Sequence, residues 1–289
     1  MATAIFEVQH ADFEQKALAW AQQFEQVCYL QSNGYNDEYS AIEAILAVDA
    51  GAIFETSDTG AFAHLENFRT KHPNTWMFGF FGYDLKNEIE NLVTSFPNRL
   101  GFPDCYFFVP KILLKFSKNS VEIHAQSPET IWQAIGDTEV PTNEEMVEPQ
   151  LEIHSRFTKE EYFTAFGHMR SHIHRGDIYE VNLCQEFYAE QAKINPLAVY
   201  QKLNEVSPTP FSTYFKINDK YILSASPERF LAKRDSTMIS QPIKGTAPRG
   251  RDPQEDAEII QQLRNNPKEI AENVMIVDLV RNDMTRSAE

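Results

Sequence analysis

Residues 221–244 read YILSASPERFLAKRDSTMISQPIK, and this stretch is the best guide to the fold. Residues 221–225 and 237–243 are apolar runs with the residue types of β-strands. Between them, residues 233–236 (Lys-Arg-Asp-Ser) have the polar composition of a tight turn. The stretch therefore predicts a β-hairpin, and with it an antiparallel sheet.

Helix signals lie on both sides of this hairpin. Residues 158–161 (Thr-Lys-Glu-Glu) have the pattern of a capping box, and apolar residues at helical spacing follow as far as Gly176. An N-cap residue followed by proline occurs at residues 195–196, 252–253 and 266–267. The remaining predicted elements are a helix at 13–27 and strands at 27–30, 76–83, 106–110, 112–116, 121–124 and 179–187. Runs of strands and helices in this order indicate an α+β fold.

The composition is that of an acidic globular protein. The chain has 289 residues, 26 of them basic and 42 acidic, which gives a formal net charge of −16. Such a charge disfavours nucleic acid and anionic membranes as partners, so a small molecule or a protein is expected instead. No stretch approaches the roughly 18 apolar residues of a membrane helix, and the first residues lack the pattern of a signal peptide. A cytoplasmic protein is therefore expected, with Cys28, Cys105 and Cys184 as buried, reduced thiols.

A connecting segment is predicted at residues 127–152, where prolines and acidic residues accumulate. It divides the chain into residues 1–126 and residues 153–289. We expect the segment to be a solvated connection between these two regions.

Lys244 follows the second strand of the predicted hairpin and directly precedes Gly245. An ammonium group at the end of an apolar strand is poorly solvated, and Arg249 and Arg251 add positive charge nearby. Both effects would lower the pKa of Lys244 towards that of a usable nucleophile or base. The alternative is a lysine whose side chain simply reaches into water.

Glu228 lies on the other arm of the predicted hairpin, so an acid and an amine would meet across a space that fits a small ring. Since Arg229 is its neighbour, Glu228 is equally explained as half of a surface ion pair.

Residues 274–280 (VMIVDLV) are apolar on nearly every side of a helix, which predicts a buried helix. Glu272 and Asp278 would then be partly buried acids, and buried acids need a partner or a metal. Glu272 suits a hard cation such as Mg²⁺, whereas Asp278 with residues 281–283 favours a structural network.

His168 and His172 are four residues apart on a predicted helix. Without a third ligand at a suitable spacing, a polar helix face explains them better than a zinc site.

Five stretches carry a family resemblance: 79–85 (GFFGYDL), 176–183 (GDIYEVNL), 226–230 (SPERF), 242–246 (PIKGT) and 272–283 (ENVMIVDLVRND). Together they resemble the chorismate-using enzymes, and within that family the branch of aminodeoxychorismate synthase component I. Anthranilate synthases usually have alanine at the position of Lys244, so the lysine points to the aminodeoxychorismate branch. Isochorismate and salicylate synthases carry a lysine near the position of Glu180, and related synthases often have glutamine there. The role of Glu180 stays open.

The resemblance implies stacked antiparallel β-sheets flanked by helices and a Mg²⁺-dependent reaction on chorismate. It implies that Lys244 attacks ring carbon 2 while Glu228 protonates the leaving 4-hydroxyl group, after which ammonia adds at carbon 4 and expels the lysine. The product would be 4-amino-4-deoxychorismate, the precursor of p-aminobenzoate and folate. By the same resemblance Gly245 and Thr246 line the ring pocket, and Glu272 holds Mg²⁺.

The resemblance also implies a partner, because the family takes ammonia from a separate glutamine amidotransferase subunit. The family continues beyond the position of Glu289 with a catalytic histidine, further Mg²⁺-binding glutamates and the loops that hold the substrate. Residues 1–289 are therefore expected to be inactive alone.

A tryptophan pocket of the family has a loose match in this chain, at Ser32, Pro208, Pro210 and Phe211. Whether tryptophan binds is left open. Two other functions also stay open, namely anthranilate synthase component I and a truncated, non-catalytic binding or regulatory module.

Overall fold

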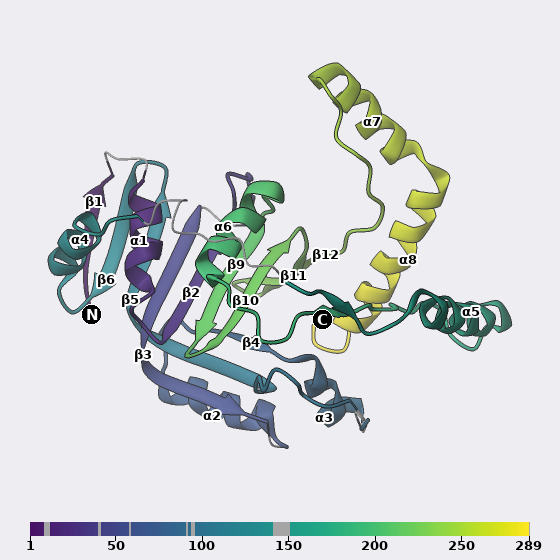
Figure 1. Ribbon diagram of the computed structural model, residues 1–289, viewed down its shortest axis with the longest axis horizontal. Helices are drawn as coiled ribbons and strands as arrows, with labels where there is room; N and C mark the ends of the chain where they lie inside the picture. Colours follow the sequence, from purple (N-terminus) through teal and green to yellow (C-terminus); the bar gives the residue numbers. More distant parts are fainter. Residues whose placement is uncertain are drawn as a thin grey trace. The chain divides into compact units, whose positions relative to one another are not determined.

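The computed structural model describes residues 1–8, 12–39, 42–57, 59–90, 92–93, 96–140 and 151–288 (Figure 1). Contacts group the chain into two compact units, Met1–Val140 with Val199–Glu289, and Pro141–Ala198. Among the described residues, no helix combines the length and the apolar content that a membrane crossing requires.

The first unit is built on an antiparallel sheet of eight described strands, in the order β1-β6-β5-β3-β2-β9-β10 with β4 paired to β5 (Figure 1). The strands are β1 (Ala2–Glu7), β2 (Gln26–Gln31), β3 (Ala44–Thr56), β4 (Phe78–Phe81), β5 (Cys105–Ser117), β6 (Ser120–Ala125), β9 (Phe211–Ile217) and β10 (Lys220–Ser226). Its helical segments are α1 (Phe13–Ala21), α2 (Ala61–Lys71), η1 (Tyr83–Leu85), α3 (Lys86–Glu90), α4 (Pro128–Gly136), α7 (Pro253–Asn265), α8 (Pro267–Met284) and most of α6 (Pro196–Val206). The predicted α+β fold with antiparallel sheets and flanking helices is confirmed.

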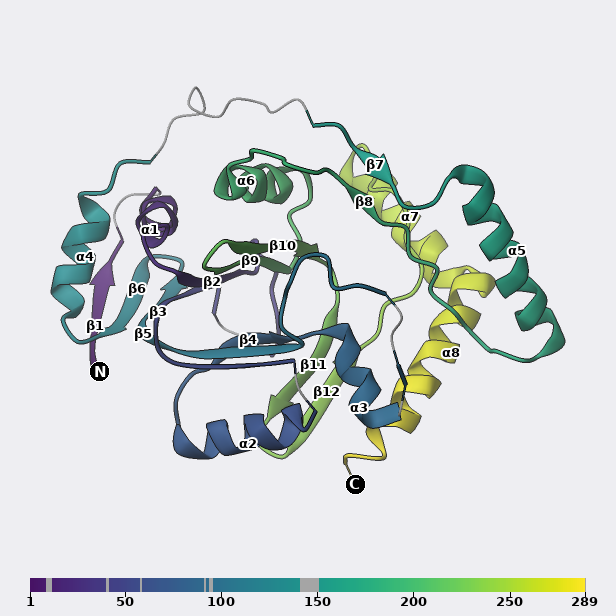
Figure 2. The same cartoon turned by 60° about the horizontal axis from the view of Figure 1, so that its bottom comes forward.

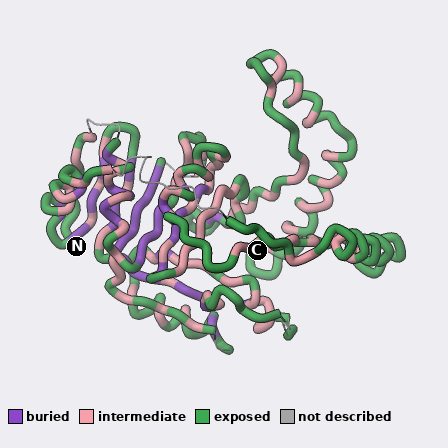
Figure 3. Tube along the Cα trace, in the orientation of Figure 1, coloured by how far each residue is buried: buried purple, intermediate pink, exposed green. Residues whose placement is uncertain are grey.

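Helices cover both faces of this sheet, with α1 and α6 on one face and α2 on the other (Figure 2). Phe13, Ala17 and Ala21 lie along one side of α1 and are buried. The helix ends at Ala21 rather than near Val27 as predicted, because β2 begins at Gln26 and pairs with both β3 and β9. Buried residues concentrate along the strands of this sheet (Figure 3).

Strand β5 corrects a prediction, because the two runs expected at 106–110 and 112–116 form one continuous strand. It pairs with β3 over almost its whole length, and the register shifts between Ala50 and Ala52. Lys111, the polar residue between the two runs, makes a 3.0 Å ion pair with Asp49 beside that shift.

Strands β9 and β10 come from the region after residue 152, yet β9 pairs with β2 from the region before residue 127. The two regions predicted from the sequence therefore share one sheet. Helix α4 occupies the first part of the segment predicted as a connection and packs against α1 and β6. Residues 141–150 of that segment lie outside the described residues.

The predicted hairpin forms, but with a different partner strand. β11 (Arg229–Arg234) pairs with β12 (Thr237–Gln241), and Asp235 at the turn has a φ of 51°. Residues 221–225, which we expected on this hairpin, belong instead to β10 and pair with β9. Strand β12 stops before Pro242, because proline has no backbone N–H group to give to a ladder.

Helices α7 and α8 begin where the sequence predicts. Asp252 accepts hydrogen bonds from the first backbone N–H groups of α7, and Asn266 does the same for α8. The prediction that α8 is buried is wrong, since none of its described side chains is buried and Val274 is 61% exposed (Figure 3). An apolar helix is buried only where another element covers it, and the described part of its own unit leaves these side chains open to solvent.

The second unit contains α5 (Lys159–Arg175) and a ladder between β7 (His154–Ser155) and β8 (Phe187–Tyr188). The capping box is confirmed, with Thr158 and Glu161 bonded in both directions, and α5 ends at Gly176. The strand predicted at 179–187 is wrong. In this part of the described chain only Phe187 and Tyr188 pair with another strand, β7.

All three cysteines are free thiols. Cys28 and Cys105 are buried as expected, whereas Cys184 is exposed, which corrects the prediction for that residue.

Candidate functional site

The end of the β11–β12 hairpin brings Glu228 beside the segment that carries Lys244. Arg229 pairs with Gln241, so Glu228 lies opposite the residues that follow β12. The Oε1 atom of Glu228 accepts a hydrogen bond from the backbone N of Ile243 at 3.0 Å. Ile243 directly precedes Lys244, so the carboxylate of Glu228 bonds to the backbone next to a partly buried lysine.

Gly245, next in the chain, is fixed by its backbone conformation and by a close neighbour. Its φ is 84°, in the left-handed region that favours glycine, and a Cβ atom there would overlap the carboxylate of Glu269. Glu269 belongs to the first turn of α8, so the segment holding Lys244 packs against the start of that helix. Thr246 follows in an exposed position.

The other end of this loop is held by α7. Asp256 accepts hydrogen bonds from Arg249 at 2.7 Å and from the backbone N of Gly250 at 2.9 Å. These contacts with Arg249 and Gly250 lower the pKa of Asp256 to about 2. The loop from Gly245 to Gly250 therefore contacts α8 at its start and α7 at its end.

This arrangement changes the expected role of two arginines. Arg249 is paired with Asp256, and Arg251 forms an ion pair with Glu255 at 3.0 Å. Because both positive charges are engaged by acids of α7, they are not available to act on Lys244 in the way that the sequence indicated.

Glu272 lies on α8 one turn after Glu269 and is less buried than predicted, with 40% of its side chain exposed. Lys268 contacts its Oε1 atom at 3.3 Å, and the hydrogen bonds and charges of these two glutamates raise the pKa of Lys268. The two carboxylates offer oxygen donors of the kind that Mg²⁺ takes with water. In the described residues they are not joined by a third His, Cys, Asp or Glu in metal-binding geometry.

The other acid predicted to be partly buried on α8 is also exposed. Asp278 makes a 2.7 Å ion pair with Arg281, as the predicted structural network implies, but both side chains are exposed and the expected partial burial of Asp278 is wrong. On α5, His172 contacts Asp177 at 2.8 Å, which agrees with a polar helix face.

The residues of the candidate tryptophan pocket come together in the sheet. The register of β2 and β9 pairs Gln31 with Ser212, which brings Ser32 to the level of Phe211. Asn33 donates a 2.8 Å hydrogen bond to the carbonyl oxygen of Thr209, the residue between Pro208 and Pro210. Pro210 and Phe211 are partly buried and Pro208 is exposed.

Two polar residues at this place were missed by the sequence reasoning. Asn33 and Asn204 exchange side-chain hydrogen bonds of 2.8 and 2.9 Å across 171 residues of sequence. A positive φ at Asn33 is compatible with a turn, but no local pattern indicates its partner.

Glu180 lies in the second compact unit and is partly buried.

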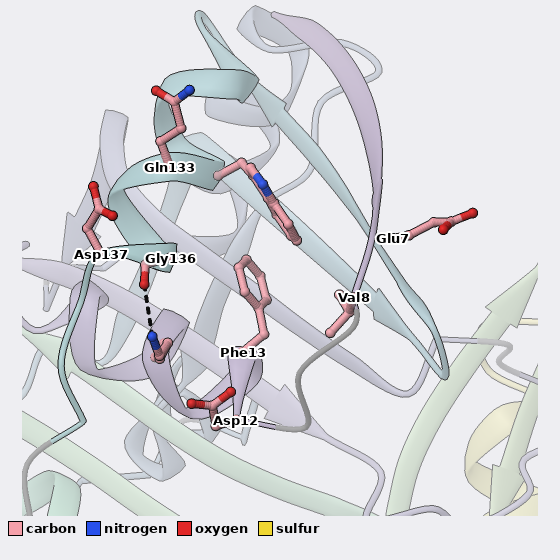
Figure 4. A pocket seen from close by; sticks show the side chains of 9 residues that line it. Glu7, Val8, Asp12, Phe13, Gln133, Gly136 and Asp137 are labelled. Carbon is pink, nitrogen blue, oxygen red and sulfur yellow. Dashed lines mark hydrogen bonds between the residues drawn. The ribbon is translucent and has the colours of Figure 1, made fainter.

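A hollow of about 800 Å³ lies elsewhere in the first unit, between β1, α1 and α4 (Figure 4). Phe13 and Trp132, whose rings stack, are among the residues that line it, and Lys16, also in the lining, donates to the carbonyl oxygen of Gly136 at 2.9 Å. None of the candidate site residues lines it, so the hollow is separate from the candidate site.

Comparisons with known proteins agree on one family. The family model described as "chorismate binding enzyme" matches residues 19–289. Aminodeoxychorismate synthase component 1 of Escherichia coli (strain K12) is 33% identical over 212 residues, covering 73% of this chain and 47% of that protein. Anthranilate synthase component 1 of Thermus thermophilus is 31% identical over 236 residues, covering 75% of this chain and 50% of that protein. The chain thus spans about half the length of these curated relatives.

Solved structures show the same fold. Anthranilate synthase component I from Streptococcus pneumoniae TIGR4 superposes with a TM-score of 0.70 at 22% identity, covering 87% of this chain and 63% of that one. The menaquinone-specific isochorismate synthase MenF of Escherichia coli gives a TM-score of 0.63 at 14% identity, covering 96% and 61%. Because the family model matches nearly the whole chain and the fold agrees with it, the chain belongs to the chorismate-binding enzyme family.

Proposed function

We propose that the protein to which this chain belongs converts chorismate and ammonia into 4-amino-4-deoxychorismate, a precursor of p-aminobenzoate and folate. The supporting observation is the bond between Glu228 and the backbone N of Ile243, because it holds the proposed acid at the residue that precedes Lys244 in the chain. Relatives called aminodeoxychorismate synthase component 1 agree with this product, and relatives called anthranilate synthase component 1 make anthranilate the second candidate.

In the proposed reaction, the Lys244 amine forms a bond to ring carbon 2 while the 4-hydroxyl group leaves as water. Glu228 gives that group its proton. Ammonia then forms a bond to carbon 4 and expels the lysine, which leaves the product and the free amine. One difficult displacement is thereby divided into two easier ones.

The loop after Lys244 has a positioning part in this proposal. In the proposal Gly245 and Thr246 line the ring pocket. Gly245 has no Cβ atom, which leaves room for the carboxylate of Glu269 and lets the loop pack against α8, and Thr246 adds a hydroxyl group at the exposed edge. Because the loop is held by α7 and α8, it keeps its shape without substrate.

Mg²⁺ is part of the proposal, and Glu272, with Glu269 beside it, would hold the ion. When bound, Mg²⁺ would screen the negative charge of the substrate carboxylate in this acidic protein. A glutamine amidotransferase subunit would supply the ammonia. The words "component 1" in the names of the relatives agree with a second, separate component.

The test is Lys244→Ala in the complete protein, supplied with chorismate, ammonia and Mg²⁺. We expect aminodeoxychorismate formation to fall to background, because a strand-end amine nucleophile has no substitute. Fluorescent anthranilate is measured in the same assay, since its appearance would mark the other branch.

Lys233→Ala is the matched control, because Lys233 lies on β11 of the same hairpin and outside the proposed chemistry. We expect this variant to keep full activity. Undiminished aminodeoxychorismate production by Lys244→Ala would remove the lysine from the mechanism. Anthranilate as the main product of the unaltered protein would favour the second candidate instead.

A further inference from the structure

Arg229 is the least exposed side chain at the start of the hairpin. Its side chain is 12% exposed, whereas Phe230, the next residue, is 90% exposed and Glu228, the one before, is also exposed. A guanidinium group is strongly hydrated in water, so its burial at this position must be compensated by specific contacts.

Four contacts surround the guanidinium group of Arg229. It donates to the carboxylate of Asp37, which is itself only 21% exposed, and its Nε atom donates to Gln241 Oε1 at 2.9 Å. Its central carbon lies 4.9 Å from the ring centre of Phe211 and 5.6 Å from that of Tyr39. The side chain therefore ties β11 to β12, to β9 and to the segment at residues 37–39.

The segment at residues 37–39 is held a second time by the same hairpin. Arg234, at the other end of β11, donates to the carbonyl oxygen of Tyr39 at 2.8 Å through Nε. Asp37 accepts from the backbone N of Tyr39 at 2.9 Å, which fixes the carboxylate that faces Arg229. Burial raises the pKa of Asp37, but the bonds from Tyr39 and Arg229 outweigh it and leave the pKa below its usual range. Asp37 is therefore ionised when it faces Arg229.

Glu228 has few backbone restraints of its own. Its backbone N contacts Ser226 Oγ at 3.4 Å, and the hydroxyl of Ser226 contacts its carbonyl oxygen at 3.3 Å, both near the long limit for hydrogen bonds. The firm anchor at this end of the hairpin is thus the next residue, Arg229.

From this geometry we infer that Arg229 is a positioning residue that fixes Glu228 for acid catalysis by pinning the start of β11 to Asp37. The inference rests on the proposed function of Glu228. It assigns Arg229 no contact with substrate. The planar guanidinium group of Arg229 bonds Asp37 and Gln241 at the same time. A lysine at this position would keep the charge but could not reproduce this geometry.

The first test needs no activity, because the bond between Glu228 and Ile243 reports on the position of the acid. Hydrogen exchange of the Ile243 amide is followed in the complete protein and in Arg229→Ala, Arg229→Lys and Asp37→Asn. We expect the amide to lose protection in all three. Asp37→Asn keeps the shape of the carboxylate and so remains informative if Arg229→Ala does not fold.

The second test separates positioning from binding. In the same variants we expect kcat to fall about tenfold or more, because a misplaced acid loses part of the roughly 10²- to 10⁴-fold contribution of a positioned one. We expect KM for chorismate to stay nearly constant. The double variant Asp37→Asn/Arg229→Ala should be no worse than the poorer single variant, because the two residues act as one unit.

Lys233→Ala is the control, since Lys233 lies on the same strand, β11, in an exposed position. It should leave both the Ile243 exchange and kcat unchanged. If Arg229→Ala and Asp37→Asn behave like Lys233→Ala, the positioning role is overturned. If Glu228→Gln keeps full activity, the proposed acid is wrong, and the exchange of Ile243 still decides whether Arg229 fixes the hairpin.

Discussion

At the scale of single residues, the candidate site depends on bonds that side chains make to backbone groups. Glu228 meets the backbone N of Ile243, and Asp256 meets that of Gly250. Such bonds hold side chains in place because the backbone partner is itself fixed by the fold. A partly buried carboxylate can also make the stability of the fold depend on pH, and Glu14 is an example.

Glu14, on α1, is partly buried and accepts hydrogen bonds from the Tyr29 hydroxyl and from Gln31 Nε2 at 2.8 Å. Burial, aided by the charge of Glu43, raises its pKa despite these bonds. The folded state therefore binds the proton more tightly than the unfolded state does. The stability that the protonated Glu14 carboxyl contributes is fully present below its pKa in the unfolded chain, and it is lost as pH rises through its pKa in the folded protein.

We predict that Glu14→Gln removes this loss, because the amide oxygen still accepts both bonds and carries no charge. Between about pH 4 and pH 7, the thermal midpoint of the variant should fall less with rising pH than that of the parent. At pH 7 its midpoint should equal or exceed the parent value. Glu7→Gln, at an exposed position, is the control; a parallel shift in both variants would contradict the role of burial.

At the scale of elements, α8 is the one whose position matters most for the proposed site. Its first turn touches Gly245 through Glu269, and its next turn carries Glu272. Lys268 pairs with both glutamates, so in the structure their negative charge is partly balanced by a lysine. A cation at Glu272 would have to compete with Lys268.

We predict that Glu272→Gln weakens Mg²⁺ binding more than it weakens folding, because the amide keeps the shape of the carboxylate but loses its charge. Activity of the complete protein titrated with Mg²⁺ should show a midpoint about tenfold or more higher. Asp278→Asn serves as control, since this acid on the same helix is paired with Arg281. An unchanged midpoint for Glu272→Gln would mean that this glutamate is a structural acid.

At the scale of the molecule, the central sheet is well covered, and the terminal helix of the described chain is not. The fully buried side chains lie on the sheet strands and on the helices that cover them, with Val27, Leu114 and Ile135 among them. On α8, Val274, Val277 and Leu279 are exposed. An apolar surface of this kind favours association.

We predict that residues 1–289, produced alone, self-associate or unfold without a sharp transition, and that they do not turn over chorismate with ammonia and Mg²⁺. The apolar side chains of α8 are the physical reason for association. Sedimentation, thermal unfolding and a turnover assay test this together. A monomer that unfolds cooperatively and turns over chorismate would require the catalytic residues to be assigned again.

Sequence signals were reliable where they act over a few residues. The capping box at Thr158, the N-caps at Asp252 and Asn266, and the turn at residues 233–236 were all predicted, because each depends on bonds within one turn of chain. The family was also recognisable, since its motifs are short and occur in order along the chain.

The sequence by itself thus determined the helix caps, the hairpin turn, the α+β class and the family. Only the tertiary structure decided that β2 lies between β3 and β9, that Arg229 meets Asp37 across 192 residues, and that α8 is exposed. The reason is physical: a cap or a turn is stabilised by its own neighbours, whereas strand partners, distant ion pairs and burial depend on which surfaces the whole chain brings together.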